Sequence, residues 1–471
     1  MMKEMTLAQI TEAVGGRFFG SEAEKGNSIT GVVIDSRQVE EGNLFIAIRG
    51  ERSDGHKYIP DVFQKGAAAV FSEEELSDPA GPYILVESGE QALKDLAEYY
   101  RSTLSIPIVG VTGSVGKTST KEMIACVLSQ KYNVLKTEGN FNNEIGMPLT
   151  LLRIRPEHEA AVIEMGIDHF GEMHRLAKVA RPDVCVMTNV GPCHLENLGD
   201  LKGVLRAKSE IFDFLKPDGA IVLNGNDPNL STIEKPAGVT PMRYLVEDGT
   251  AFDTDAEASR AYTVRATDIK NHGFAGMEAA FAFSDGTTLP VSEPLPGVHN
   301  LYNACAAACV ALHLGLTKEE IRTGIASAQT IAGRSNRIAL KDGILLIDDC
   351  YNANPVSMKA SIGVLALAEG RTIAVLGDMG ELGTDEVALH AEVGACVKEN
   401  NIDLLLCTGT LSKALADAAT GGHTQVSHFD TKEALQQALL KEIHPNDTIL
   451  IKASHFMGYE TLVESVRHLY K

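Results

Sequence analysis

The chain has 471 residues, of which 44% are hydrophobic and 22% charged, and its net charge at pH 7 is −21. This length exceeds one ordinary core, so we expect two to four domains, each large enough to fold without disulfide or metal support. The negative charge argues against extended binding to nucleic acid, which needs a basic surface along the phosphates, so any phosphate site must be locally basic.

The compartment is inferred from the cysteines and from the first residues. The eight cysteines form no CxxC pair and mostly lie in apolar runs, which favours reduced core residues over metal ligands or disulfides. Residues 1–16 suit an amphipathic helix and lack an apolar segment followed by a cleavage site. No segment approaches the roughly 20 apolar residues that span a bilayer. We therefore expect a cytoplasmic protein without a membrane span.

Short strands and helices alternate over the first hundred residues. A helix is predicted over residues 90–104, and Pro107 disfavours helix at the residue before it, so we place the end of a first domain at residue 104. The apolar runs that predict its strands are residues 29–36, 43–50, 67–72 and 83–88.

A second domain is predicted over residues 105–331. Its strands and helices alternate as in a parallel sheet covered by helices. Residues 240–295 have shorter, more polar strands that suit antiparallel pairing, and a helix follows over residues 299–315. The buried strands are predicted at residues 107–113, 160–166, 183–190 and 219–224, and the first of them is followed by a helix at residues 118–132.

A third domain is predicted over residues 332–471. It repeats strand and helix, but no glycine-rich phosphate loop follows its first strand. The strands are predicted at residues 344–349, 372–379, 403–409 and 447–454, with a helix at residues 432–443. The whole chain is thus predicted to have an α/β fold in which two doubly wound domains follow the N-terminal one.

The strongest single motif is the sequence TGSVGKTS at residues 112–119, directly between a buried strand and a helix. In that position glycines let backbone N–H groups turn toward phosphates, and the helix N-terminus attracts negative charge. Val111 stands where the general Walker pattern has its first glycine, so the match is to the shorter variant T-G-x-x-G-K-[ST]. We favour this interpretation over a glycine-rich turn without a ligand. The nucleotide-binding residues predicted here are Thr112, Gly113, Ser114, Val115, Gly116, Lys117, Thr118 and Ser119, with Lys117 at the β- and γ-phosphates and Thr118 at Mg²⁺.

Three further residues suggest chemistry beside this loop. Glu164 ends a buried strand, where its carboxylate would reach the carboxyl edge of the sheet and offer oxygen to a hard cation. His194 follows another strand, and metal coordination and an ordinary hydrogen-bonded loop histidine remain equal alternatives. Lys208 lies on a helix face with apolar neighbours, where burial would lower its pKa, although the pattern alone favours a surface lysine.

In the third domain Asp348 and Asp349 end the strand at residues 344–349, where they are either ligand-binding acids or turn residues. Arg334, just after the second boundary, is a candidate for binding a γ-phosphate or acyl phosphate, because a guanidinium group binds such oxygens in pairs.

Taken in order, these segments resemble the Mur ligase family. The resemblance runs from DSRQVEEGNLFIAIRG at residues 35–50 to IKASHFMG at residues 451–458 and so covers nearly the whole chain. The blocks GNFNNEIG, DDCYNANP and LGDMGELG are most similar to the member that adds a D-alanyl-D-alanine dipeptide to UDP-N-acetylmuramoyl-tripeptide. The resemblance implies an ATP-dependent peptide-bond ligase of peptidoglycan precursor synthesis with Mg²⁺ and ATP. It also implies three domains: one for the UDP-sugar, a central ATP domain and a Rossmann-like domain for the dipeptide. We expect a monomer.

The resemblance also implies roles for single residues. Thr118 and Glu164 would hold one Mg²⁺, His194 a second, and Lys208 would carry a carbamate that supplies an anionic ligand. The lysine and arginine at the phosphates would be Lys117 and Arg334, with Asp349 beside the nucleotide. The remaining residues implied in binding are Ser36 and Arg37 with Asp54, Gly55 and His56 in the UDP domain, Asn140, Asn142 and Asn143 between substrate and nucleotide, His299, Asn300 and Asn303 near adenine, and Tyr351 and Asn352 at nucleotide or dipeptide.

The chain departs from the family at two points. The expected K-G-S-R block reads Lys452-Ala453-Ser454-His455, so an arginine contact to the dipeptide carboxylate is missing there. The sequence AGRSNR leaves open whether Arg334 or Arg337 binds phosphate. Two other function classes stay open: a sister ligase, such as the enzyme that adds the third residue or a folylpolyglutamate synthase, and a nucleotide-dependent binding protein without ligase activity.

Overall fold

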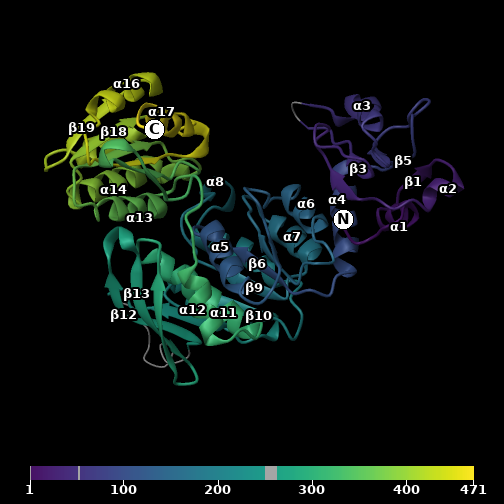
Figure 1. The fold of residues 1–471 in the computed structure, drawn as a ribbon, viewed down its shortest axis with the longest axis horizontal. Coiled ribbons are helices and arrows are strands. Elements are labelled where there is room, and N and C mark those ends of the chain that lie inside the picture. Colours follow the sequence, from purple (N-terminus) through teal and green to yellow (C-terminus); the bar gives the residue numbers. More distant parts are fainter. Residues whose placement is uncertain (1, 51–52, 250–261) are drawn as a thin grey trace.

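The computed structural model describes residues 2–50, 53–249 and 262–471, and its strands form three sheets of five, nine and six strands in chain order. The N-terminal and C-terminal units lie at opposite ends of the molecule, and the middle unit lies between them (Figure 1). The predicted α/β fold with three sheet-containing units is confirmed.

The first sheet has the strand order β1-β5-β4-β3-β2, and only β1 pairs antiparallel to its neighbour. All four predicted strands are present, whereas β1 was not predicted because it has three residues and no periodicity to read. The strands are β1 (Arg17–Phe19), β2 (Gly31–Val33), β3 (Asn43–Ile46), β4 (Ala69–Ser72) and β5 (Tyr83–Leu85). The helices are α1 (Leu7–Ala13), α2 (Glu22–Lys25), α3 (Ile59–Gln64) and α4 (Gly89–Ser102).

Helix α4 joins the first unit to the middle one. The Tyr100 hydroxyl donates a hydrogen bond to the carbonyl oxygen of Ile154 (2.5 Å), and the Arg101 guanidinium contacts Ala180 O and the Asp183 carboxylate, each at 2.8 Å. The apolar core is continuous from the first sheet through α4 into the middle unit. This packing fixes α4 against the domain that carries the phosphate loop.

The middle sheet has the order β14-β13-β12-β11-β10-β9-β6-β8-β7. In this spatial order, every pair from β12 to β7 is parallel, β6 included, whereas β12 with β13 and β13 with β14 are antiparallel. The antiparallel prediction therefore holds for β12, β13 and β14, while β11 joins the parallel part. The strands are β6 (Ile108–Thr112), β7 (Val134–Lys136), β8 (Ala160–Glu164), β9 (Val184–Met187), β10 (Ala220–Asn224), β11 (Met242–Val246), β12 (Val264–Asn271), β13 (Met277–Phe283) and β14 (Thr288–Glu293).

Helices cover both faces of the middle sheet. One core contains residues of α5, α11 and α12, and the other contains residues of α6, α7 and α9. Successive residues of β8 alternate between them, since Ile163 belongs to one core and Val162 to the other. The helices are α5 (Lys117–Leu128), α6 (Gly146–Leu152), α7 (Glu172–Ala180), α8 (Leu195–Leu198), α9 (Leu201–Ser209), α10 (Pro228–Ser231), α11 (His299–His313) and α12 (Lys318–Ala326).

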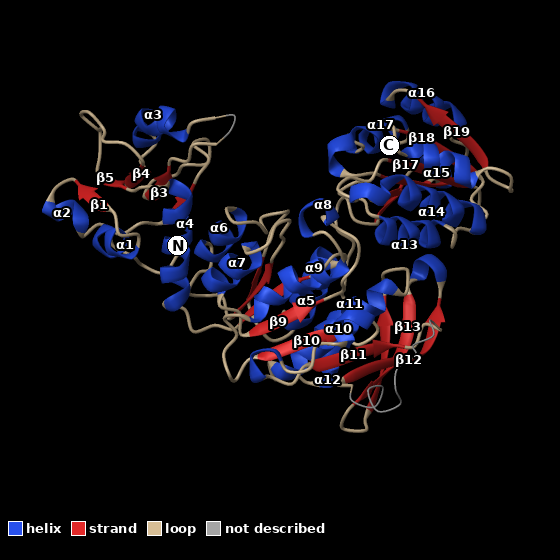
Figure 2. Ribbon diagram, turned by 180° about the vertical axis from the view of Figure 1, so that it is seen from behind, coloured by secondary structure: helices blue, strands red, loops and turns tan. Residues whose placement is uncertain are grey.

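The third sheet has the order β15-β16-β20-β17-β18-β19, with only β15 antiparallel. Helices α13 and α14 lie against one face and α16 and α17 against the other, as the view from behind shows (Figure 2). The strands are β15 (Asn336–Ala339), β16 (Leu345–Asp348), β17 (Thr372–Gly377), β18 (Leu404–Thr408), β19 (Gln425–Phe429) and β20 (Thr448–Lys452). The helices are α13 (Pro355–Leu365), α14 (Glu386–Glu399), α15 (Ser412–Ala419), α16 (Lys432–Glu442) and α17 (Glu460–Leu469).

Two expectations from composition can be compared with the structure. All eight cysteines are free, and five of them are buried, as expected for reduced core residues. None of the described helices is long and apolar enough to cross a bilayer.

A buried acid at the end of β14 predicts a pH-dependent loss of stability. Burial raises the pKa of Glu293 to about 8, and one of its carboxylate oxygens has no hydrogen-bond partner among the described residues. Because the unfolded carboxyl titrates near 4.5, the folded state holds the extra proton between these values, so stability falls as pH rises from about 4.5 through about 8. Glu293→Gln should therefore stabilise the protein by roughly 2 kcal/mol at pH 9 and change little at pH 4.5.

Denaturant unfolding at the two pH values measures this difference. The matched control is Glu278→Gln on the neighbouring strand β13, whose side chain is exposed. Equal shifts for both variants, or a Glu293→Gln effect that is the same at both pH values, would contradict the assignment.

Candidate active site

The phosphate loop lies where the sequence predicts it, between the end of β6 and the start of α5. Gly113 and Gly116 have positive φ angles of 146° and 82°, and a Cβ atom at Gly113 would lie 2.0 Å from the Thr188 hydroxyl. Only glycine fits there. Residues after β9 hold the loop: Asn189 accepts the backbone N–H of Val115 at 2.9 Å.

Lys117 is the first residue of α5, and its Nζ atom lies over the loop, 2.8 Å from the carbonyl oxygen of Gly113. Burial lowers the pKa of this lysine, whereas the nearby Glu164 carboxylate raises it. The lysine and the helix N-terminus together give the locally basic site that an acidic chain needs for phosphate.

Glu164 lies beside the loop because β8 is the neighbour of β6, with Glu164 in register with Val111. Its side chain is almost fully buried, and its two oxygens accept hydrogen bonds from the Thr118 hydroxyl and the Asn142 amide, each at 2.8 Å. Lys121 Nζ lies 3.8 Å from the carboxylate. A hydroxyl and a carboxylate next to a phosphate loop are the oxygen donors that Mg²⁺ prefers, so the residues fit this ion.

Lys208 is fully buried on α9, which decides against the surface lysine that its pattern alone favoured. Its Nζ atom has no hydrogen-bond partner within the described chain. Burial lowers the pKa of Lys208 to about 8, and the charge of Lys117 acts in the same direction. A buried amine without a partner is costly, and at this pKa a substantial fraction is neutral and able to react.

His194 precedes α8 with a left-handed backbone, φ 52°. Its Nδ1 atom lies 2.6 Å from the carboxylate of Glu381, which belongs to the loop between β17 and α14 of the third unit. The histidine lowers the pKa of that carboxyl. His194 therefore stands at the boundary between the middle and third units.

The start of α11 supplies side-chain amides to the site, next to α5. Asn303 accepts a hydrogen bond from the Thr120 hydroxyl at 2.8 Å and donates one to Asn300 at 3.1 Å, while Asn300 donates to the carbonyl oxygen of Pro296 at 2.9 Å. Both asparagines are buried. Burial also lowers the pKa of the adjacent His299, which favours its neutral form.

In the third unit Asp349 organises the segment that carries Arg334. Its carboxylate accepts the backbone N–H of Ser335 at 2.9 Å and pairs with the buried Lys452 at 2.7 Å. Lys452 also donates to the carbonyl oxygen of Asn352 at 3.0 Å. The Arg334 guanidinium lies 4.0 Å from the ring centre of Tyr351. Asp348 has the turn role weighed from the sequence, since it accepts the N–H of Cys350, two residues on, at 3.4 Å, and it also accepts the N–H of Gly333 at 3.0 Å.

One cavity of about 1550 Å³ joins these parts of the middle and third units. The residues predicted for the site that line it are Ser114, Val115, Gly116, Lys117, Thr118, Ser119, Asn142, Asn143, Glu164, His194, His299, Asn300, Asn303, Arg334, Asp349, Tyr351 and Asn352. Thr112 and Gly113 belong to the phosphate loop, and Lys208 is near enough to Lys117 for the two charges to interact, but these three residues do not line the cavity.

The residues predicted for the UDP end lie outside this cavity. Among the described residues before 105, only Glu90 lines it. Arg37 is exposed and pairs with Asp35 at 2.8 Å, Ser36 accepts a hydrogen bond from Lys65 through its carbonyl oxygen, and Asn140 is exposed. The role of Ser36 and Arg37 at the UDP end, and that of Asn140 between substrate and nucleotide, stay predictions. Asp54 and His56 shape a turn of the same unit, with Asp54 2.7 Å from His56 Nδ1 and the N–H of Glu73 donating to His56 Nε2, and their part in the UDP domain is likewise untested.

Some lining residues were not found from the sequence. Asn224, Asn226 and Asp227 lie at the end of β10, and Asn226 bonds the backbone of Val246 through both its oxygen and its nitrogen. The signal was present: the segment NGND begins at the last residue of a predicted parallel strand, and ligand sites gather at such strand ends.

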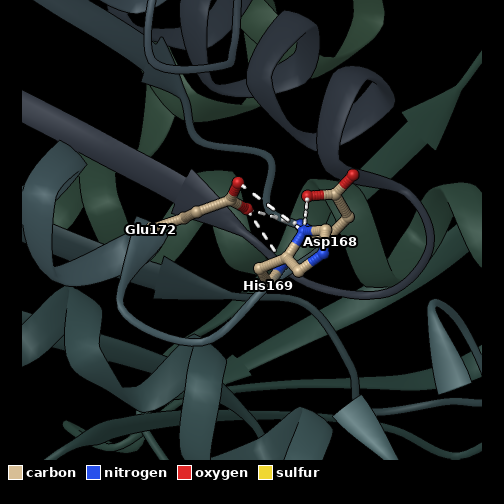
Figure 3. Close-up of side chains that lie close together, drawn as sticks. All are labelled: Asp168, His169 and Glu172. Atoms are coloured by element: carbon tan, nitrogen blue, oxygen red, sulfur yellow. Dashed lines mark hydrogen bonds and ion pairs between the residues drawn. The ribbon is translucent and has the colours of Figure 1, made fainter. Parts of the chain in front are cut away.

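A second missed group is Asp168, His169 and Glu172, which lie close together after β8 (Figure 3). Glu172 accepts the backbone N–H groups of Asp168 and His169 at 2.8 and 3.0 Å, and His169 Nδ1 is 2.8 Å from Asp168. These bonds fix the turn that leads from Glu164 into α7. Their spacing would suit a cation, but Asp168 and His169 are exposed to solvent.

The choice between Arg334 and Arg337 can be tested. Arg334 lines the cavity, whereas Arg337 donates to the carbonyl oxygens of Phe274 and Pro294 in the middle unit. If Arg334 binds the transferred phosphoryl group, as the resemblance implies, Arg334→Ala should lower kcat/KM for ATP by about 100-fold. Arg337→Ala should leave KM for ATP nearly unchanged and lower Tm, since it removes bonds between the two units. Steady-state kinetics and thermal unfolding of both variants distinguish the roles, and a reversed pattern would assign the phosphate contact to Arg337.

Comparison with known proteins agrees with this geometry. Three family models match: "Mur ligase family, catalytic domain" at residues 28–101, "Mur ligase middle domain" at 111–311 and "Mur ligase, glutamate ligase domain" at 333–455. The chain belongs to the Mur ligase family. It is 36% identical to the UDP-N-acetylmuramoyl-tripeptide–D-alanyl-D-alanine ligase of Bacillus subtilis over 99% of both chains.

Solved structures show the same likeness over the whole length. The structure is similar to MurF from Acinetobacter baumannii, with a TM-score of 0.88 at 32% identity over 99% of both chains. It is also similar to MurF ligase from Thermotoga maritima in complex with ADP, with a TM-score of 0.79 at 31% identity, covering 93% of this chain and 97% of that one. The predicted family is thereby confirmed.

Proposed function

We propose that this chain is an ATP-dependent ligase that joins D-alanyl-D-alanine to the terminal carboxylate of a UDP-N-acetylmuramoyl-tripeptide and releases ADP and phosphate. The observation that carries the proposal is the single cavity in which the phosphate loop, Glu164 and the Arg334 segment of the third unit meet. The named relatives of similar length support the choice of substrates. The reaction belongs to peptidoglycan precursor synthesis, and we expect a cytoplasmic monomer.

ATP is assigned to the phosphate loop, with its adenine toward Asn300 and Asn303. The Mur relative from Thermotoga maritima is described in complex with ADP, which supports a nucleotide at this loop. Asp349 and Arg334 approach the same space from the third unit. We therefore expect bound nucleotide to contact residues of two units.

Mg²⁺ is assigned first to Thr118 and Glu164 and, at a second position, to His194. When bound, the ions neutralise charge on the phosphate oxygens. Lys208 is assigned as a carbamate, because its buried amine has no partner and a carbamate would turn it into an anionic oxygen ligand.

The chemistry proceeds in two steps. A carboxylate oxygen of the tripeptide attacks the γ-phosphorus, the bond to the β-phosphate oxygen breaks, and an acyl phosphate and ADP form. Lys117 and Arg334 donate hydrogen bonds to the phosphoryl oxygens while charge moves onto the leaving group. The free amine of D-alanyl-D-alanine then attacks the acyl carbon, loses a proton, and phosphate leaves.

The substrates are assigned to the outer units. Residues 1–104 would hold the UDP end, with contacts from Ser36 and Arg37, and residues 332–471 the dipeptide, with residues 105–331 holding ATP between them. Asn140 and Asn143 would lie along the path of the tripeptide. Tyr351 and Asn352 would contact nucleotide or dipeptide, because both line the cavity on the third unit.

The test is phosphate release from ATP with UDP-N-acetylmuramoyl-tripeptide, comparing D-alanyl-D-alanine with D-alanine, L-lysine and glutamate as acceptors. Mass spectrometry of the product accompanies it. Release that requires the dipeptide and yields a pentapeptide is the expected result. Release only with glutamate or L-lysine would make the chain a sister ligase, and hydrolysis independent of any acceptor would reject the proposal.

A further inference from the structure

The contact between His194 and Glu381 is unusual in its backbone and in its position. Both residues have left-handed backbones, with φ angles of 52° and 60°, although neither is glycine. Such conformations cost free energy for residues with a Cβ atom, and they persist where the surrounding structure holds them. Here two of them face each other across the boundary of two units.

The loop that carries Glu381 is held by several parts of the third unit. The N–H of Met379 donates to Nε2 of the buried His390 at 2.9 Å, and the N–H of Gly380 donates to the Ser454 hydroxyl at 2.9 Å. Just before them, the Asp378 carboxylate accepts the N–H of Ser412 at 2.7 Å. Glu381 therefore projects from a fixed turn.

The same loop contacts the start of α8. A Cβ atom built at Gly383 would lie 3.5 Å from Cβ of Leu195, the residue after His194. Glu381 and Gly383 thus meet two successive residues of the middle unit. The contact is an interface between the loop and α8 rather than a single exposed pair.

The protonation of the ring follows from the distance. Nδ1 of His194 is buried and lies 2.6 Å from Glu381, yet its N–H direction does not meet hydrogen-bond geometry with any described residue. At 2.6 Å an unprotonated nitrogen would repel the carboxylate, so Nδ1 carries the proton. In the neutral ring, Nε2 is then the nitrogen with a free lone pair. Because His194 lines the cavity, this nitrogen is the one that can serve a ligand there.

We propose that Glu381 is a positioning residue that holds His194 with Nδ1 protonated and Nε2 available to the cavity, so that the third unit completes a site on the middle unit. This inference rests on the proposed function, in which His194 serves the phosphoryl-transfer site. A carboxylate on the far nitrogen of a metal-binding histidine fixes both tautomer and ring orientation. The unit that holds the acceptor would in this way also prepare the site of phosphoryl transfer.

Three variants test the proposal in the full-length protein. Glu381→Ala removes the carboxylate that lies 2.6 Å from Nδ1, whereas Glu381→Gln keeps an uncharged carbonyl oxygen at that place. The control is Glu392→Ala, because Glu392 forms an exposed pair with Lys359 at 2.7 Å in the same unit. Circular dichroism and Tm establish that each variant is folded.

Kinetics and metal binding provide the first two readouts. Glu381→Ala should lower kcat by about 10- to 100-fold with KM for ATP and tripeptide within about threefold, and weaken Mn²⁺ binding in the presence of ADP by about 10-fold. Glu381→Gln should recover most of both losses, and Glu392→Ala should match the wild type. The third readout is the ¹⁵N spectrum of labelled histidine side chains, in which the His194 signal is identified by its absence in His194→Gln. Of the three test variants, only Glu381→Ala should lose the fixed Nδ1–H tautomer of His194.

Two results would overturn the inference. One is a Glu381→Ala variant whose kcat and Mn²⁺ affinity stay within twofold of the wild type, which would reduce the contact to a surface ion pair. The other is an increase confined to KM for the dipeptide, which would make Glu381 a substrate contact. A wild-type protein without ligase activity would reject the proposed function instead, while Mn²⁺ affinity and the tautomer would still report on Glu381.

Discussion

Lys117→Ala is expected to lower kcat for ATP-dependent ligation by about 100- to 1,000-fold, because the proposed function places this lysine at the transferred phosphoryl group. Its Nζ atom lies over the phosphate loop, 2.8 Å from the carbonyl oxygen of Gly113, and lines the cavity with Thr118 and Glu164. In the transition state charge spreads over the phosphoryl oxygens, and a fixed ammonium group stabilises it more than it stabilises bound ATP. The loss should therefore fall mainly on kcat.

The measurement is phosphate release at saturating ATP, tripeptide and dipeptide. Lys131→Ala is the control, since Lys131 lies beyond the end of α5 and bonds the carbonyl oxygen of Gly315. Tm should not fall in Lys117→Ala, because the substitution removes a cation whose pKa burial has lowered. A variant that keeps kcat within tenfold of the wild type would show that Lys117 does not act on the phosphoryl group.

The strands that the sequence predicted and those it missed differ in position within the sheets. Strands β6, β8, β9 and β10 are fully buried, so their apolar runs are continuous and easily recognised. The strands that were missed, β1, β7, β15 and β19, all lie at sheet edges. An edge strand has a neighbour on one side only and is partly exposed, so its sequence lacks a continuous apolar run.

The site divides in a similar way between local and distant features. The phosphate loop is one continuous segment, so residue type and spacing suffice to place Lys117 and Thr118. Glu164 was predictable because parallel strands bring their carboxyl ends to one edge. Glu381 was not, because its meeting with His194 depends on how the third unit packs on the second. Arg334 and Arg337 are three residues apart and similar in sequence context, and only the packing of β15 separates their directions.

Lys208→Met is expected to separate activity from stability. The amine of Lys208 is fully buried without a hydrogen-bond partner among the described residues, and methionine fills a similar volume without the charge. The variant should lose at least about 100-fold in kcat if the lysine supplies a ligand to the site. It should also be more stable, by roughly 2–3 kcal/mol near pH 7, because the cost of burying an unpaired ammonium group disappears.

The pH dependence of this gain follows from the direction of the shift. The pKa of Lys208 is about 8 in the folded protein and 10.5 in the reference state. The unfolded chain therefore binds more protons between these values, and wild-type stability rises with pH over that interval. The advantage of Lys208→Met should be full below pH 8 and shrink as pH rises toward 10.5, which denaturant unfolding in the presence of a metal chelator measures.

Bicarbonate decides whether the lysine acts as an amine or as a carbamate. The neutral amine can add CO₂, forming an N–C bond and releasing a proton, which places an anion where the ammonium group was buried. Wild-type activity should then fall in CO₂-depleted buffer and return with bicarbonate, whereas Lys208→Met should respond to neither. Full activity of Lys208→Met would exclude a ligand role for this side chain. A wild type that is indifferent to bicarbonate, combined with an inactive variant, would leave the lysine essential as an amine and remove the carbamate from the mechanism.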